Sequence, residues 1–561
     1  MAEETAQRSG AELLIEALKM NDLTKMYGVV GIPVTDFARL AQLRGMKYYG
    51  FRREDAAVDA AAAEGFLTGN PGVGLTISAP GFLNGLTALA QATKNCFPLI
   101  MISGSSERHV IDLDRGDYEG LDQYNVAKPF CKAAYRVDRA QDVGLAVARA
   151  VRTALSGRPG GVYLDVPAST LSDVVADGGD QTLFEVVDPA PVQLPSPAAI
   201  DRAVDLLKGA KHPLVIIGKG AAYGRAEAEV KDFIDQTKFP FLPMSMAKGL
   251  LPDDHPSSVA ARSLSLKEAD VVVLLGARLN WLLSNGEAPH FSPDAKFIQV
   301  DIDASEFDSN RQIHAPLRGD LKAVVAALGV ATKAAGIVAD QAWLDLLGAK
   351  VQENKDKMAA RLATKRQPLG YYGALIPLMK LFKDHPDTYL VSEGANTLDI
   401  GRNLIDLYLP RHRLDTGTWG VMGVGLGYAI GAAVAMQKPV IALEGDSAFG
   451  FDGMEMETIC RYHLPVTVMI LNNGGIYNGD DQEVPDQPGP AMLDATAKYE
   501  LLATAFGGDA YSVTTQEEME DALTKAYASG CPNIINVTID PKIGKESGHI
   551  GNLNPKINLS K

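Results

Sequence analysis

The stretch EGDSAFGFDGMEMETICRYHLPVTVMILNNGGIY (444–477) begins where one apolar strand ends at Glu444 and contains a second, and a polar turn follows each strand. Asp446 follows the first strand and Asn473 follows the second, with a predicted helix between them. Two strands joined by a helix are typical of a parallel sheet, whose ligands bind beyond the carboxyl ends of the strands. We therefore expect Asp446 and Asn473 to lie together at one edge of a sheet.

The residue types at this edge favour a magnesium–diphosphate site. Mg²⁺ prefers oxygen ligands and is usually shared with phosphate oxygens. The Asp446 carboxylate, the Asn473 side-chain oxygen and the Gly475 carbonyl can supply the protein's ligands. Gly445 lets the backbone approach a diphosphate closely, and the Ala448 N–H lies at a helix start suited to phosphate.

The same alternation of apolar strands and helices extends along the chain in both directions, which predicts α/β structure with mostly parallel sheets. A Pro-rich linker at 188–197 and a charged helix-forming stretch at 351–367 separate the repeats. The fold class is therefore three consecutive open α/β domains, over residues 1–188, 198–350 and 368–561. The predicted strands include GVGLTIS (72–78), FPLIMISG (97–104), GGVYLDVP (160–167), HPLVIIGKGA (212–221), ADVVVLLGARL (269–279), KFIQVDID (296–303), TYLVSEG (388–394) and PNIINVTID (532–540).

Composition narrows the class of protein. The net charge of −16 argues against a nucleic-acid surface. No apolar run is long enough to span a membrane, and the acidic start does not resemble a secretory signal. Four scattered cysteines predict reduced thiols rather than a zinc site or disulfides. We expect a cytoplasmic protein without nucleic-acid or membrane partners, in which any anionic ligand is met by a local cationic cluster.

The 27-residue spacing of Asp446 and Asn473 resembles the GDG…NN motif of thiamine-diphosphate-dependent enzymes, with Ser447 replacing the last glycine. The segment YYGFRREDAAVDAAAA (48–63) is similar to the family segment that carries an activating glutamate, here Glu54. The resemblance implies thiamine diphosphate and Mg²⁺ as cofactors. It also implies that Glu54 activates the cofactor by protonating the far side of its aminopyrimidine ring.

Two further segments match the family: SAPGFLNGL (78–86) and GTWGVMGVGLGYAIGA (417–432). Taken alone, the second is more typical of close helix packing. In the family the two ends of the cofactor are held by different subunits, which implies at least a homodimer, with a tetramer expected. The resemblance assigns cofactor contacts to Glu54, Tyr372, Ala395, Asn396, Gly420, Val421, Met422, Gly445, Ser447, Ala448 and Tyr477.

Within the family the chain resembles the oxalyl-CoA decarboxylase group, which converts oxalyl-CoA to formyl-CoA and CO₂ in oxalate breakdown. The resemblance rests on Tyr118-Glu119 within RGDYEGLDQYNVAKPF (115–130) and on the tail ESGHIGNLN (546–554), which corresponds to the group's mobile closing segment. It implies that Tyr118, Glu119, Tyr477 and Ser547 act beside Glu54 in catalysis.

The resemblance also implies contacts with two nucleotide-bearing ligands. The predicted CoA contacts are Ile32, Tyr118, Arg262, Ser263, Asn354, Arg402, Asn403, Ser547 and Gly548. Arg262 and Arg402 fit ordinary solvated arginines nearly as well. The turn GKGAAYGRAE (218–227) is a degenerate dinucleotide-binding turn. In this group it is expected to hold ADP, an activator, rather than FAD. The predicted ADP contacts are Arg158, Lys219, Arg278 and Asp301.

Two alternatives remain at this level. A 2-hydroxyacyl-CoA lyase shares the cofactor, CoA and most of these motifs. A non-catalytic, nucleotide-binding regulatory protein would be expected to lack Glu54 or Asp446, and both are present.

Overall fold

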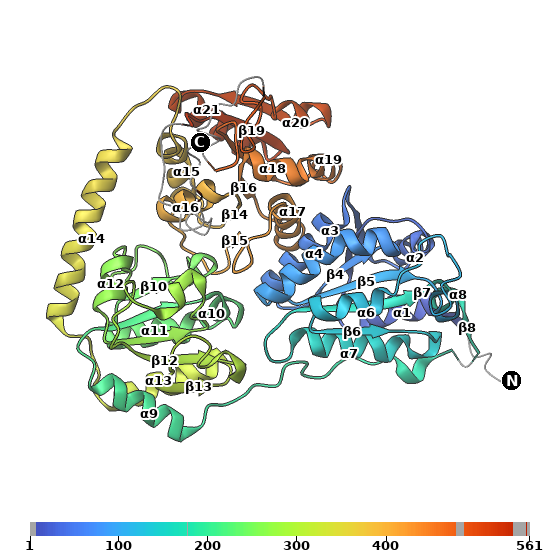
Figure 1. Ribbon diagram of the computed structural model, residues 1–561, viewed down its shortest axis with the longest axis horizontal. Coiled ribbons are helices and arrows are strands. Elements are labelled where there is room, and N and C mark those ends of the chain that lie inside the picture. The colour runs from blue at the N-terminus through green and yellow to red at the C-terminus, as the bar shows by residue number, and fades with distance from the viewer. Residues whose placement is uncertain (1–6, 177, 478–486, 542–556, 558–561) are drawn as a thin grey trace.

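The computed structural model describes residues 7–176, 178–477, 487–541 and 557. It contains three open, wholly parallel sheets with helices on their faces, which confirms the predicted α/β fold (Figure 1). A separate antiparallel pair, β1 (Arg8–Ser9) and β8 (Val174–Val175), joins the start and end of the first domain.

The N-terminal sheet explains why its strands are apolar along their whole length. Ile100 and Ile102 of the central strand face one core, and Leu99 and Met101 face the other, so both faces are buried. Helices α1 (Gly10–Met20), α2 (Thr35–Leu43) and α7 (Val143–Leu155) cover one face, and α3 (Glu54–Thr68) and α4 (Ala79–Asn95) cover the other. The strand order is β3 (Lys47–Gly50), β2 (Lys25–Gly28), β4 (Gly72–Thr76), β5 (Leu99–Ser105), β7 (Gly161–Pro167), β6 (Ala133–Arg136).

The central domain is a five-stranded version of the same plan. Its strand order is β10 (Phe241–Pro243), β9 (Pro213–Ile217), β11 (Val271–Leu275), β12 (Lys296–Asp301), β13 (Ala315–Arg318). Its helices are α9 (Pro197–Lys208), α10 (Lys219–Tyr223), α11 (Glu227–Thr237), α12 (Arg262–Glu268) and α13 (Leu321–Ala334). Helix α14 (Gln341–Leu362) leads to the C-terminal domain and runs through the boundary predicted at 350. The domain boundaries themselves stay predictions.

The C-terminal sheet repeats the order of the N-terminal one. Its strands are β15 (Arg413–Asp415), β14 (Tyr389–Ser392), β16 (Val440–Gly445), β17 (Val466–Asn472), β19 (Asn533–Thr538), β18 (Asp509–Val513). Numbered within its own domain, each six-stranded sheet reads 2-1-3-4-6-5. Helices α15 (Tyr371–Asp384), α16 (Ala395–Leu404) and α21 (Gln516–Ser529) cover one face, and α17 (Gly425–Met436), α18 (Asp446–Asp452) and α19 (Met456–Arg461) cover the other; α20 (Leu501–Ala505) precedes β18.

One continuous hydrophobic core contains residues of all three domains. At its centre the Ala-rich helix α3 crosses the Gly-rich helix α17 (Figure 1). A Cβ added at Gly431 would lie 2.3 Å from the Ala60 carbonyl oxygen, and one at Gly427 would lie 2.8 Å from the Ala56 carbonyl oxygen. Gly427 and Gly431 therefore serve close helix packing, whereas the glycines at 417–423 lie in the loop before α17.

We expect Gly431→Val to destabilise the protein by about 1–3 kcal/mol or more, because the new side chain would force α17 away from the backbone of α3. Thermal unfolding monitored by circular dichroism measures the loss. Gly450→Val is the matched control, since a Cβ at Gly450 of α18 has no neighbour within 4 Å. Equal stability of the two variants would contradict this view of the α3–α17 contact.

Within the described ranges, no helix is both long and apolar enough to cross a membrane.

Candidate functional site

The structure brings the three predicted metal ligands together. Asp446 begins α18 directly after β16, and Asn473 follows the neighbouring parallel strand β17. Gly475 N–H donates to Asp446 Oδ2 at 3.1 Å, and Ser447 N–H donates to Oδ1 at 2.8 Å. Burial raises the pKa of Asp446 to about 6, although these amides act in the opposite direction.

This set of ligands suits a cation that is shared with a diphosphate. Asp446 and Asn473 are buried and both offer hard oxygen atoms. In the described part of the chain no three His, Cys, Asp or Glu side chains are grouped to hold a metal. One carboxylate, one amide and one carbonyl leave the remaining positions of an octahedron to phosphate oxygens and water, so these residues fit the Mg²⁺–diphosphate end of the predicted cofactor.

The segment 393–396, which follows β14, lies against the turn after β16 that carries Gly445 and Asp446. A Cβ added at Gly394 would lie 3.2 Å from the Gly445 nitrogen. Asn396 Nδ2 donates to the Tyr477 carbonyl oxygen at 2.9 Å, and Asn473 Nδ2 donates to the same oxygen at 2.7 Å. The backbone at Tyr477 is therefore fixed by both loops, while its side chain is exposed.

Glu393, which the sequence analysis did not single out, joins this loop to the segment before α17. Its buried carboxylate accepts the amides of Gly423, Val424 and Gly425 at 2.6–2.8 Å. Burial raises the pKa of Glu393. The predicted cofactor residues Ala395 and Met422 are thus tied together through one side chain.

The remaining predicted cofactor contacts have varied surroundings. Val421 and Met422 are half-buried, Gly420 is exposed, and Ala448 is buried in α18 next to the half-buried Ser447. The Tyr372 hydroxyl accepts from Arg361 of α14 at 3.2 Å. Its neighbour Tyr371 is buried, and burial raises its pKa to about 12, with Asn396 and Asp446 also acting on it. Tyr371 therefore also lies near Asn396 and Asp446, and the cofactor contact of Tyr372 stays a prediction.

Glu54 begins α3 and is buried. Its Oε2 accepts from Asn84 Nδ2 at 2.9 Å. Its Oε1 lies 2.8 Å from where a Cβ on Gly81 would stand. The segment 78–86, predicted from the family pattern, thus forms the wall against which this carboxylate rests.

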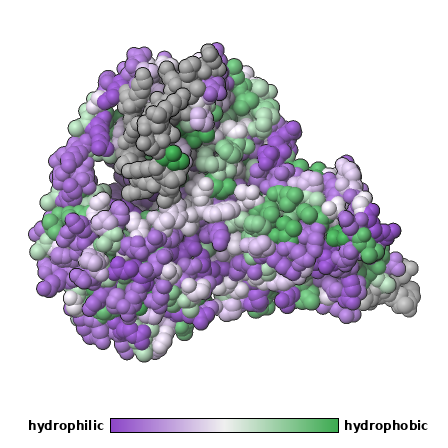
Figure 2. All heavy atoms as spheres, in the orientation of Figure 1, coloured by the Kyte–Doolittle hydropathy of each residue, from purple (hydrophilic) through white to green (hydrophobic). Residues whose placement is uncertain are grey.

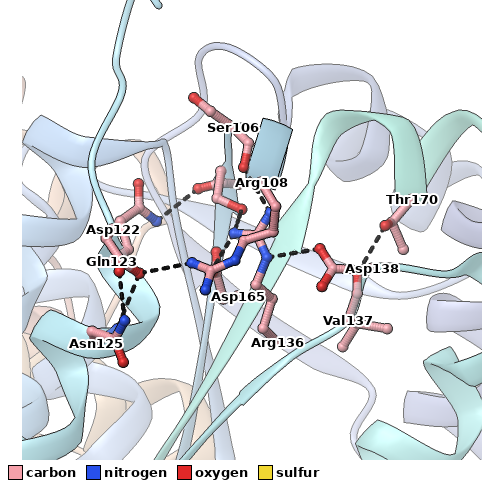
Figure 3. A network of polar contacts seen from close by, with 12 residues as sticks. Ser106, Arg108, Asp122, Gln123, Asn125, Arg136, Val137, Asp138, Asp165 and Thr170 are labelled. Atoms are coloured by element: carbon pink, nitrogen blue, oxygen red, sulfur yellow. Dashed lines mark hydrogen bonds and ion pairs between the residues drawn. The ribbon is translucent and has the colours of Figure 1, made fainter. Parts of the chain in front are cut away.

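Tyr118 and Glu119 lie in the segment between α5 (Arg108–Ile111) and α6 (Gln123–Ala127). A polar network, buried at Arg136 and Asp165, fixes both of its ends (Figure 3). Arg136 donates to Asp165 at 2.9 Å and to the Ser106 carbonyl at 2.8 Å, and Arg108 pairs with Asp122 at 3.3 Å. Gln123 accepts the Ala79 amide at 2.6 Å, which connects this segment to the wall beside Glu54.

Between these fixed ends the two predicted catalytic residues differ. Tyr118 is 80% exposed. Glu119 is half-buried, its Oε2 has no hydrogen-bond partner among the described residues, and burial raises its pKa.

Most of the predicted CoA contacts converge where the central and C-terminal domains meet. Desolvation of its guanidinium and the nearby Arg402 of α16 lower the pKa of Arg262 of α12 to about 10, although the Arg262 residue as a whole is exposed. Arg262 donates to the Leu282 carbonyl at 2.8 Å and Arg402 pairs with Asp399 at 3.0 Å, so two guanidinium groups from different domains lie near each other. Asn354 of α14 donates to the Ala260 carbonyl at 2.8 Å, next to this pair. Ser263 and Asn403 are exposed beside them.

Two other predicted CoA contacts, Ile32 and Tyr118, lie apart from this cluster. Ile32 lies in the N-terminal domain after β2 and is 67% exposed. Ser547 and Gly548 lie outside the described residues.

The four predicted ADP contacts also converge, at the ends of β9, β11 and β12. Arg158 and Arg278 both pair with Glu306. Burial lowers the pKa of Lys219 to about 7 and raises the pKa of Asp301 to about 6. Arg158 also donates to Cys96 Sγ at 3.2 Å. A cluster of three cations in an acidic protein suits an anionic ligand.

Comparison with known proteins agrees with this geometry. Models of the thiamine pyrophosphate enzyme N-terminal TPP binding domain, central domain and C-terminal TPP binding domain match residues 8–126, 200–328 and 394–537. The chain is 54% identical to oxalyl-CoA decarboxylase of Escherichia coli strain K12 over 99% of both chains. It is 41% identical to 2-hydroxyacyl-CoA lyase of Arabidopsis thaliana, over 97% of this chain and 98% of that one, and 41% identical to 2-hydroxyacyl-CoA lyase 1 of Homo sapiens over 96% of both. The chain belongs to the thiamine pyrophosphate enzyme family.

Proposed function

We propose that this protein is a thiamine-diphosphate-dependent carbon–carbon lyase that converts oxalyl-CoA and a proton to formyl-CoA and CO₂. The observation that carries the proposal is 54% identity to an oxalyl-CoA decarboxylase along the full length, against 41% to the lyases. All three domains of the family are present, in order. Both Glu54 and Asp446 are retained, which disfavours the non-catalytic alternative.

The chain's own residues account for cofactor binding. Asp446, Asn473 and Gly475 would hold Mg²⁺, while the loops joined by Glu393 would surround the diphosphate and ring. When bound, thiamine diphosphate supplies a nucleophilic carbon and an electron sink for loss of CO₂. Glu54 would hold the activating proton at Oε1, since Oε2 accepts from Asn84.

The second proton, which replaces the departing CO₂, needs a separate donor. Glu119 suits this task because burial raises its pKa and because no residue in the described part of the chain bonds to its Oε2. Tyr118, Tyr477 and Ser547 would orient the substrate carboxylate, since hydroxyl groups donate to a carboxylate without adding like charge.

Arg262 and Arg402 would bind the phosphates of CoA. Two neighbouring cations repel each other, and an anion between them relieves that repulsion. The cluster at Arg158, Lys219, Arg278 and Asp301 would bind ADP rather than FAD, with Asp301 at the end of β12 placed for ribose hydroxyls.

A homo-oligomer, at least a dimer and by family resemblance a tetramer, would complete the site. Tyr118 is 80% exposed, and Leu83, Phe451 and Met454 present apolar surface around the Glu54 wall and α18. Figure 2 shows apolar residues gathered on both the N-terminal and the C-terminal domain. All four cysteines are free, which suits the reducing cytoplasm.

We expect Arg402→Ala to raise the KM for oxalyl-CoA by about 10–100-fold with a smaller change in kcat, because a charge-assisted hydrogen bond contributes about 1.5–3 kcal/mol. Steady-state kinetics with oxalyl-CoA measure the changes in KM and kcat separately. Lys357→Ala is the matched control, because it removes a cation one turn from Asn354 that is paired with Glu353, as Arg402 is paired with Asp399, but that does not belong to the Arg262–Arg402 pair. A KM that stays at the wild-type value would assign Arg402 to the solvated surface.

The central test incubates the protein with thiamine diphosphate, Mg²⁺ and oxalyl-CoA, and quantifies formyl-CoA by chromatography. Formation of formyl-CoA with one equivalent of CO₂ supports the proposal. Inactivity on oxalyl-CoA combined with cleavage of a 2-hydroxyacyl-CoA to formyl-CoA and an aldehyde would assign the protein to the lyases. That second activity is the alternative favoured by the relatives at 41% identity.

A further inference from the structure

The loop between β15 and α17 is held by side chains of both other domains. Asn95, the last residue of α4, is 1% exposed. Its Nδ2 donates to the Thr416 carbonyl at 2.9 Å, and its Oδ1 accepts the Thr418 amide at 2.9 Å. Gly417 permits this approach, because its φ is +65° and a Cβ there would lie 2.2 Å from Asn95 Oδ1.

The same Asn95 oxygen also faces the cationic cluster of the central domain. Lys219 Nζ donates to Asn95 Oδ1 at 2.6 Å. One buried atom thus accepts from the cluster predicted to bind ADP and from the loop that carries Gly420 and Met422. The loop lies in the C-terminal domain, whereas Lys219 and Arg278 of the cluster lie in the central domain.

Thr418 has a second connection to the central domain. Arg278 Nη2 donates to Thr418 Oγ1 at 3.2 Å, and Trp281 Nε1 donates to the Thr418 carbonyl at 2.9 Å. The amide, hydroxyl and carbonyl of Thr418 therefore all bond to residues outside its own domain. A change in the position of Lys219 or Arg278 acts directly on this residue.

We propose that Asn95 is the positioning residue through which an anionic nucleotide at Lys219 and Arg278 sets the conformation of loop 416–422, and thereby the affinity for the cofactor. The inference rests on the proposed nucleotide and cofactor sites and names the route between them. A phosphate at the cluster competes with Asn95 for the Lys219 ammonium group, which alters the acceptor available to the Thr418 amide. Coupling of this kind is reciprocal, so the cofactor changes nucleotide affinity by the same factor.

The test uses the full-length protein freed of cofactor. Isothermal titration calorimetry gives the Kd for ADP, and fluorescence of Trp281 and Trp419 during thiamine diphosphate titration with Mg²⁺ gives the Kd for the cofactor. For the wild type we expect saturating ADP to lower the cofactor Kd by roughly 5–150-fold, the usual range of such coupling. In Asn95→Asp the donor to Thr416 is lost, and the carboxylate holds the Lys219 ammonium group so firmly that a phosphate no longer competes for it. The coupling factor should therefore fall to near one while ADP still binds at Arg158 and Arg278.

Gln91→Glu is the matched control. Gln91 lies on the same helix and donates to the same Thr416 carbonyl at 2.8 Å, but its hydrogen bond does not involve Lys219. The control makes the same amide-to-carboxylate change and should retain the ADP effect. Asn95→Ser, which is too short to bridge Lys219 and Thr418, serves if Asn95→Asp fails to give cooperative thermal unfolding.

The outcomes separate the inference from the function on which it rests. A wild-type protein that does not bind ADP overturns the nucleotide site and this inference together. Binding of ADP with no effect on the cofactor Kd overturns the inference alone, as does an unchanged coupling factor in the Asn95 variants. Equal loss of coupling in Gln91→Glu would show that Asn95 only stabilises the loop, and would also overturn it.

Discussion

Glu54→Gln is expected to lower kcat for formyl-CoA production by roughly 10²–10⁴-fold, the contribution typical of one positioned acid–base group. Glutamine keeps the shape of the buried side chain and can still meet Asn84 and the wall at Gly81, but it cannot exchange a proton. Cofactor affinity and thermal stability should therefore change little. Steady-state assay of formyl-CoA, with cofactor titration by fluorescence, measures both parts of this expectation.

Asp55→Asn is the control for that experiment. Asp55 is the next residue of α3 and pairs with Arg53 at 2.9 Å. The substitution therefore removes a neighbouring carboxylate from the same helical turn. Its kcat should remain within about threefold of the wild type, because the half-buried Asp55 carboxylate pairs with Arg53 and has no part in the proposed chemistry. If Glu54→Gln retained comparable activity, Glu54 could not be the activating acid.

Asp446→Asn is expected to weaken Mg²⁺-dependent thiamine diphosphate binding by about 10²-fold or more, because a buried anionic ligand is replaced by a neutral one. The protein without cofactor should be no less stable than the wild type, since burial raises the pKa of Asp446 to about 6 and so penalises its charged form. The cofactor should therefore raise the Tm of the wild type and not of the variant. Differential scanning calorimetry with and without cofactor measures this difference.

The pH dependence gives an independent check. A proton on Asp446 competes with Mg²⁺, so wild-type affinity for the metal should fall as pH drops through about 6. Asp494→Asn, at a carboxylate that accepts from Thr496 in an exposed turn, is the control and should bind the cofactor normally. A cofactor-induced rise in Tm that survives in Asp446→Asn would place the metal elsewhere.

The strands that the sequence predicted are mainly those buried on both faces. Val271–Leu275 and Val466–Asn472 are apolar throughout because neighbours cover them on every side. The strands not predicted from the sequence are the short pair β1 and β8, together with β6, β13, β15 and β18, and all of them lie at sheet edges. The three residues of β15, Arg-Leu-Asp, are fully buried, yet two of them are charged and pair with each other at 3.4 Å. Burial of this kind depends on tertiary partners and leaves no apolar pattern in the sequence.

The candidate site shows the same division. Asp446 and Asn473 could be found because a strand end precedes each of them, and strand ends meet at one edge of a parallel sheet. Glu393 and Asn95 could not, because each acts on backbone amides of a loop that is remote in sequence. Nothing in the local pattern around either residue indicates the loop that it will bind.

Helix α14 links the central and C-terminal domains, so its length sets the distance and rotation between them. It has 22 residues, which span about 33 Å, and only Trp343 and Leu347 are buried. It therefore acts as a rigid helical linker between the central and C-terminal domains, and its exposed positions should tolerate most substitutions. Its length should not vary: inserting one residue would turn one end against the other by about 100° and advance it by about 1.5 Å. Such a twist would separate Lys219 from Asn95, and Arg262 from Arg402, without altering a single residue of either site.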